Sequence, residues 1–149
     1  MIPPFDAVSG QLPPGEHAAT WVELCERFGG TAQRDALLQE LGEVLRLLAR
    51  AGCRRVDVDG SFVTRKAAPD DVDACWDTAG VDLDRLDERL WRSRSAQASN
   101  VPAGPWRCDL YIADAPADGL GLSMREFFQF DRNGLPKGIV VIDPQECLL

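Results

Sequence analysis

Hydrophobic and polar residues repeat with two different periods along the chain, and each period predicts a different kind of element. Residues 32–51 place leucine and valine at intervals of three and four, which is typical of an amphipathic helix. Residues 56–59, 71–76 and 106–113 alternate apolar with polar side chains, as half-buried strands do. The apolar run at 138–143 predicts one more strand, inside or along the same sheet.

Capping and turn residues mark further elements. Thr20 and Ser123 are each followed three residues later by glutamate, which is the pattern of a capping box. This predicts helices over 21–28 and directly after Ser123. A leucine stripe predicts another helix over 83–94, and the polar, proline-bearing residues 95–105 predict a long loop after it.

The order of these elements predicts the fold class. Two helices are followed by two strands, and then helix and strand alternate twice. This order is typical of an α/β or α+β domain with a small mixed sheet and helices packed mainly on one face. The length allows one domain with a single core, which we place at 17–149. Residues 1–16 are rich in proline and glycine and predict an extended N-terminal arm.

Charge and composition narrow the range of partners. The net charge of −8 argues against broad, non-specific binding of nucleic acid, whose phosphates require a basic surface. No run of residues approaches the ~20 apolar positions of a membrane helix, and the N-terminus lacks the features of a secretory signal. The five cysteines form no Cys-x-x-Cys pair and the chain has one histidine, so neither a zinc site nor a disulfide framework is expected. We therefore expect a cytoplasmic protein with reduced thiols and no membrane partner.

Two acidic residues and a glycine turn carry the candidate chemistry. Asp71 and Asp73 are two residues apart on a predicted strand, so their side chains point to the same face. Adjacent carboxylates repel each other unless a cation lies between them, and oxygen ligands favour Mg²⁺ or Mn²⁺. Gly60-Ser61 ends the preceding strand, because glycine allows a sharp turn and a close backbone approach. The alternative is that the aspartates are solvated acids of a turn that begins at Pro69.

The arrangement of these residues resembles the motif of the nucleotidyltransferases of the DNA polymerase beta superfamily. In this chain Gly60-Ser61 is followed, after nine residues, by Asp71-Val72-Asp73. That family places a third carboxylate on a later strand, between apolar residues, and Asp109 in the sequence RCDLYIA matches this place. The resemblance implies a nucleotidyltransferase-like fold.

The resemblance also implies a reaction and a set of roles. The reaction is the transfer of a nucleoside monophosphate from a nucleoside triphosphate, with ATP as the first choice, to a hydroxyl group of a protein or RNA. Asp71 and Asp73 would bind two Mg²⁺ or Mn²⁺ ions, and Asp109 would join them at the second ion and position or deprotonate the hydroxyl group. The residues that would bind the phosphates are Gly60, Ser61, Arg65 and Lys66.

Two departures from the family pattern leave alternatives open. Members usually have a glycine shortly after Gly-Ser and often a serine before the first aspartate, whereas this chain has Thr64-Arg65-Lys66 and Asp70. One alternative is a catalytically degenerate fold that acts as a binding or neutralising module. Another is a two-metal nuclease, which is less favoured because it would not need the Gly-Ser turn and would usually have a more basic surface.

The small size of the chain bears on its partners. Larger nucleotidyltransferases use an added helical domain to hold the base and the acceptor, and 149 residues leave little room for one. In this respect the chain resembles the antitoxin nucleotidyltransferases that pair with HEPN toxins and adenylylate them, which implies a toxin as protein partner. The chain also resembles a family of small bacterial proteins of unknown activity over nearly its whole length. The stretches that carry this second resemblance are 12–21, 59–66 and 127–143.

The remaining charged residues are expected to be exposed. Asp57 and Asp59 alternate with valine and are predicted to face outward from the first strand. Arg34 is predicted to lie on a solvated face of the long helix, and Lys137 is predicted to be a lysine of a turn.

Overall fold

The computed structural model describes residues 1–91, 105–117, 119 and 121–148, and its centre is a five-stranded mixed sheet. The strands lie in the order β1-β5-β2-β3-β4; β1 pairs with β5 and β3 pairs with β4 in parallel, and the two other pairings are antiparallel. The strands are β1 (Gly15–Ala18), β2 (Val56–Asp59), β3 (Val72–Trp76), β4 (Cys108–Ile112) and β5 (Gly138–Ile142). The predicted α/β class with a small mixed sheet is therefore confirmed.

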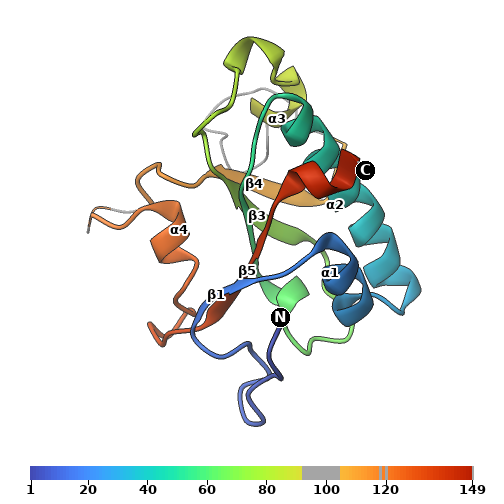
Figure 1. The fold of residues 1–149 in the computed structure, drawn as a ribbon. Helices are drawn as coiled ribbons and strands as arrows, with labels where there is room; N and C mark the ends of the chain where they lie inside the picture. The colour runs from blue at the N-terminus through green and yellow to red at the C-terminus, as the bar shows by residue number, and fades with distance from the viewer. Residues whose placement is uncertain (92–104, 118, 120, 149) are drawn as a thin grey trace.

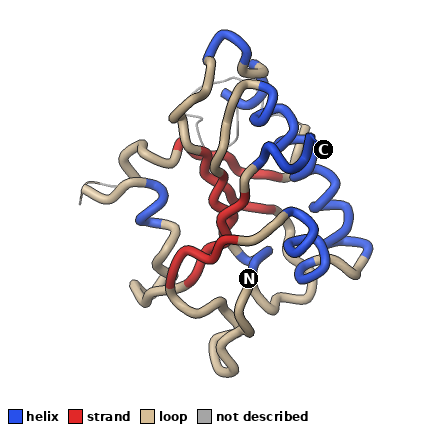
Figure 2. The backbone as a smooth tube through the Cα atoms, viewed as in Figure 1, coloured by secondary structure: helices blue, strands red, loops and turns tan. Residues whose placement is uncertain are grey.

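The helices are distributed unequally over the two faces of this sheet. Figures 1 and 2 show α1 and α2 on one side together with the C-terminal 3-10 helix, while α4 lies on the opposite side. The helices are α1 (Trp21–Phe28), α2 (Ala32–Arg50), α3 (Glu88–Trp91) and α4 (Met124–Phe127), and the 3-10 helices are Ser61–Val63, Leu83–Arg85 and Pro144–Leu148. Thr20 and Ser123 cap α1 and α4 as the sequence predicts, and Ser123 forms a complete capping box with Glu126. None of the described helices is both long enough and apolar enough to cross a bilayer.

Two segments differ from the sequence-based prediction. The helix predicted over 83–94 is, in its described part, a 3-10 turn followed by the single turn α3; residues 92–94 and most of the predicted loop at 95–105 lie outside the described residues. The strand β1 was not predicted, because its sequence GEHA has no β-branched or aromatic residue. It begins at Gly15, and two side chains of the N-terminal segment, Ile2 and Leu12, are buried in the main core.

The main core lies between α2 and one face of the sheet. The leucine stripe of α2 is buried, and Val58 and Ala74 face it from the two central strands with no exposed surface. A smaller cluster under α4 joins Phe128 to Ile139 on the opposite face. Because strand side chains alternate between faces, the residues next to the core valines, including the candidate aspartates, lie on the side of α4.

Candidate metal centre

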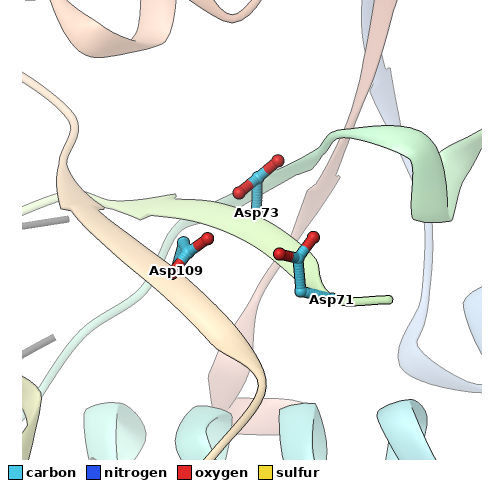
Figure 3. Close-up of side chains that lie close together, drawn as sticks. All are labelled: Asp71, Asp73 and Asp109. Atoms are coloured by element: carbon cyan, nitrogen blue, oxygen red, sulfur yellow. The ribbon is translucent and has the colours of Figure 1, made fainter. Parts of the chain in front are cut away.

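The register of the sheet brings the three candidate aspartates together. Asp73 on β3 is paired with Asp109 on the parallel neighbour β4, and Asp71 comes directly before β3. Each of the three half-buried residues offers a carboxylate oxygen, and these oxygens all lie within 4.8 Å of one another. Figure 3 shows the three side chains on the same side of the two strands. We call this group, Asp71, Asp73 and Asp109, the aspartate triad.

The electrostatics of the triad are those of crowded carboxylates. The pKa of Asp73 is raised to about 7, first by burial and then by the neighbouring charges of Asp71, Asp109 and Asp59, in that order of importance. One oxygen of Asp109, Oδ1, is shielded from solvent. A divalent cation bound by oxygen ligands would relieve the repulsion, so the donor set suits Mg²⁺ or Mn²⁺.

Gly60 forms the corner that lies against the triad. Its φ of +83° is in the region that favours glycine, and Gly60 directly precedes the 3-10 helix Ser61–Val63 as its N-cap. A Cβ atom at position 60 would collide with Oδ2 of Asp73. Glycine is therefore required here both by the backbone conformation and by the close approach to a triad carboxylate, which places Ser61 next to the site.

Asp59 extends the acidic row across the sheet, and its predicted outward orientation is wrong. It is paired in register with Asp73, and it is 4% exposed. Nζ of Lys137 donates to Oδ1 of Asp59 at 2.8 Å, so Lys137, which was predicted to be a turn lysine, is instead a partner of this buried carboxylate directly before β5. Burial raises the pKa of Asp59, while Lys137 opposes that shift.

Asp57 is also buried, which corrects the second outward assignment. Its two carboxylate oxygens accept from Nε of Arg55 at 3.0 Å and from Nε of Arg125 at 2.8 Å. Arg125 belongs to α4 and also donates to Asp77 at 3.2 Å. The alternation of β2 correctly separated valine from aspartate, but the strand itself carries no sign that α4 covers the aspartate face.

Arg34 is the residue near the site that the sequence-based prediction missed. It is 7% exposed, whereas a solvated helix face was expected. Its guanidinium donates to four backbone carbonyl groups and lies over the ring of Phe62. The four carbonyl groups belong to Phe28, Phe62, Thr64 and Lys66. Arg34 therefore fixes the loop that follows the Gly60 corner, a role that no helical pattern reveals.

The two predicted phosphate-binding cations lie on this same loop. Arg65 is exposed, its Nη2 donates to the carbonyl of Ala7 at 3.3 Å, and its side chain packs against Gly10. Lys66 is exposed, and its backbone carbonyl accepts from Arg34. The structure thus places Arg65 against the N-terminal segment and holds the backbone of Lys66, while the Lys66 ammonium faces solvent.

Comparisons with known proteins place the chain in one family. Neither the comparison with curated proteins nor the comparison with solved structures gives a match. The family model that matches covers residues 3–143, which is most of the chain. The protein therefore belongs to the family described as "Family of unknown function (DUF6932)".

Proposed function

We propose that the protein is a Mg²⁺-dependent nucleotidyltransferase that moves a nucleoside monophosphate from a nucleoside triphosphate to a hydroxyl group of a protein or RNA. The observation that carries the proposal is the aspartate triad beside the Gly60 corner, with carboxylate oxygens within 4.8 Å of one another. A divalent cation bound there would polarise the triphosphate and lower the pKa of the acceptor hydroxyl group.

Each residue of the site has a role in this reaction. Asp71 and Asp73 hold the cation, and a carboxylate oxygen of Asp109 orients the acceptor hydroxyl group and takes its proton. The acceptor oxygen forms a bond to the α-phosphorus while the bond to the bridging oxygen breaks, and pyrophosphate leaves. Backbone N–H groups at Gly60 and Ser61 would bind the departing phosphates.

Transfer of label from an α-³²P nucleoside triphosphate tests the proposal. The purified protein is incubated with Mg²⁺, each of the four triphosphates and cell lysate, and labelled protein and RNA are counted. The double variant Asp71→Asn/Asp73→Asn is expected to lower the transfer on the order of 100-fold, since a metal ion contributes several kcal/mol to such a reaction. The matched control is Asp84→Asn, because Asp84 is exposed and contributes to a 3-10 turn outside the triad. No transfer by the wild type, or equal transfer by the double variant, would contradict the proposal.

The second candidate function is a binding module that has lost catalysis, such as the neutralising partner of a toxin. The observation in its favour is the loop Thr64-Arg65-Lys66, which replaces the glycine usual in the nucleotidyltransferases that the chain resembles and whose backbone accepts two hydrogen bonds from Arg34. Titration calorimetry with ATP and Mg²⁺ separates the two functions. Metal-dependent ATP binding that is lost in the double variant supports the enzyme, whereas absence of binding in both supports the module.

A further inference from the structure

A cavity of about 450 Å³ lies on the α4 side of the sheet, at its β1 edge. Its apolar walls include Phe130, Pro136 and Pro14, and its polar groups include Lys137, Glu126 and Gln129. We call it the Phe130 cavity. Its volume is in the range of cavities that bind small organic ligands.

Lys137 connects the Phe130 cavity to the aspartate triad. This residue lines the cavity, and its Nζ atom lies 2.8 Å from Oδ1 of Asp59, which is the register partner of Asp73. Lys137 directly precedes β5, and β2 separates β5 from β3 in the sheet. At about 4.8 Å between strands, the near wall of the cavity lies roughly 10 Å from Asp73.

The cavity and the triad also share one face of the sheet. Arg125 of α4 binds Asp57, which lies on the same side of β2 as Asp59. Asp59, Asp73 and Asp109 are neighbours in register, so their side chains point to that side too. The triad and the cavity therefore lie on the same side of the sheet, at a separation comparable to the length of a nucleoside.

The residues that line the cavity indicate which part of a nucleotide would bind there. Its carboxylates and its lysine already have partners: Glu16 pairs with Arg55, Glu126 accepts from the backbone N–H of Ser123, and Lys137 pairs with Asp59. Such a lining gives phosphate groups no unpaired lysine, so they are instead attracted to a cation at the triad. The ring of Phe130 and the two prolines offer flat apolar surfaces to a planar group, and carboxylate and amide oxygens accept from its N–H groups.

We propose that the Phe130 cavity is the nucleoside-binding subsite of the triad. This inference rests on the proposed function, and it assigns the base to the α4 side of the sheet and the phosphates to the metal. The preferred ligand is a nucleotide whose base carries an amino group, because the two glutamates accept hydrogen bonds and donate none.

Calorimetry with two probes tests this assignment. α,β-Methylene ATP and inorganic tripolyphosphate are each titrated with Mg²⁺ into the wild type, Phe130→Ala and Phe127→Ala. Phe127 is the matched control, since it is 47% exposed on α4, whereas Phe130 is 42% exposed and lines the cavity. We expect the wild type to bind the nucleotide about tenfold more tightly than tripolyphosphate, because stacking of one base on an aromatic ring supplies this much.

The outcomes separate the two proposals. Loss of the tenfold difference in Phe130→Ala, with tripolyphosphate binding unchanged and Phe127→Ala like the wild type, supports the subsite. Equal binding of both probes by the wild type, or a nucleotide preference that Phe130→Ala retains, overturns the subsite and leaves the metal site standing. Absence of metal-dependent binding of either probe overturns the proposed function and the subsite together.

Discussion

One face of the sheet carries two groups of buried acids that differ in their counter-charges. The first, which we call the clamped pair, is Asp57 and Asp77, bound by Arg55 and Arg125 at 2.8 to 3.2 Å. The second is the aspartate triad, where the largest influences on Asp73 are burial and three other carboxylates. The clamped pair lies on β2 and directly after β3, whereas the triad lies directly before β3, on β3 and on β4.

This difference distinguishes carboxylates that are paired within the fold from carboxylates that could hold a metal ion. In the clamped pair each carboxylate has a guanidinium partner, so burial is offset within the protein and α4 is held to the sheet. In the triad burial and the charges of Asp71 and Asp109 raise the pKa of Asp73 to about 7. A site that is strained in this way gains most from a bound cation, which is why perturbed carboxylates are frequent at functional sites.

Removing a guanidinium from the clamped pair should have the largest effect on stability. We expect Arg125→Met to lower the free energy of unfolding by about 3 kcal/mol, because the fully buried Asp57 loses one of its two guanidinium partners. Urea denaturation followed by circular dichroism measures this loss. Arg132→Met is the control, since Arg132 is exposed and its replacement should change stability by less than about 0.5 kcal/mol. Equal losses in the two variants would show that the clamp is not structural.

The sequence predicted those helices and strands whose apolar residues repeat regularly on one buried face. The stripe of α2 and the alternation of β2, β3 and β4 each reflect burial against a single large core, and the spacing of Asp71 and Asp73 followed from the same alternation. The meeting of Asp109 with them was predicted from the resemblance, and the parallel register of β3 and β4 accounts for it.

What the sequence could not predict depends on contacts between distant segments. Period two shows which residues of β2 share a face, but not that α4, some 68 positions later, brings Arg125 to Asp57. Arg34 was missed for the same reason, since its carbonyl partners include loop residues about 30 positions away. The four-residue strand β1 depends on its pairing with β5 and has little strand propensity of its own.

A substitution at Gly60 should disturb the triad without touching the clamped pair. Gly60 and Gly134 have φ values of +83° and +79°, but a Cβ would collide with Asp73 only at Gly60 and would meet open space at Gly134. We expect Gly134→Ala to cost about 1 kcal/mol through backbone strain alone, and Gly60→Ala about 2 kcal/mol because the collision adds to it. Denaturation of both variants gives the difference. If the two costs are equal, the corner does not press on the triad.

Metal binding should stabilise the wild type and depend on the triad. At a Mg²⁺ concentration ten times its dissociation constant, the free energy of unfolding should rise by about 1.4 kcal/mol. Thermal unfolding with and without Mg²⁺ measures this shift, and Asp73→Asn should abolish it. Arg125→Met is the informative counterpart, because it destabilises the protein without touching the triad and should retain the Mg²⁺ shift. A shift that persists in Asp73→Asn would place the metal elsewhere.

The smallest expected effect is a pH dependence of Mg²⁺ binding, which follows from the raised pKa of Asp73. Asp73 has a higher pKa in the folded protein, about 7, than its ordinary value of 3.8, so the metal-free folded state binds the extra proton. Its contribution therefore makes the metal-free protein less stable as the pH rises from 3.8 to about 7. Mg²⁺ must displace that proton, so its affinity should rise about fivefold, or about 1 kcal/mol, from pH 6 to 7 and only about twofold from pH 7 to 8. Calorimetric titration at the three pH values measures this curve. An affinity that is already constant above pH 5 would mean that Asp73 ionises like an ordinary surface acid, and the contrast with the clamped pair would then be one of geometry alone.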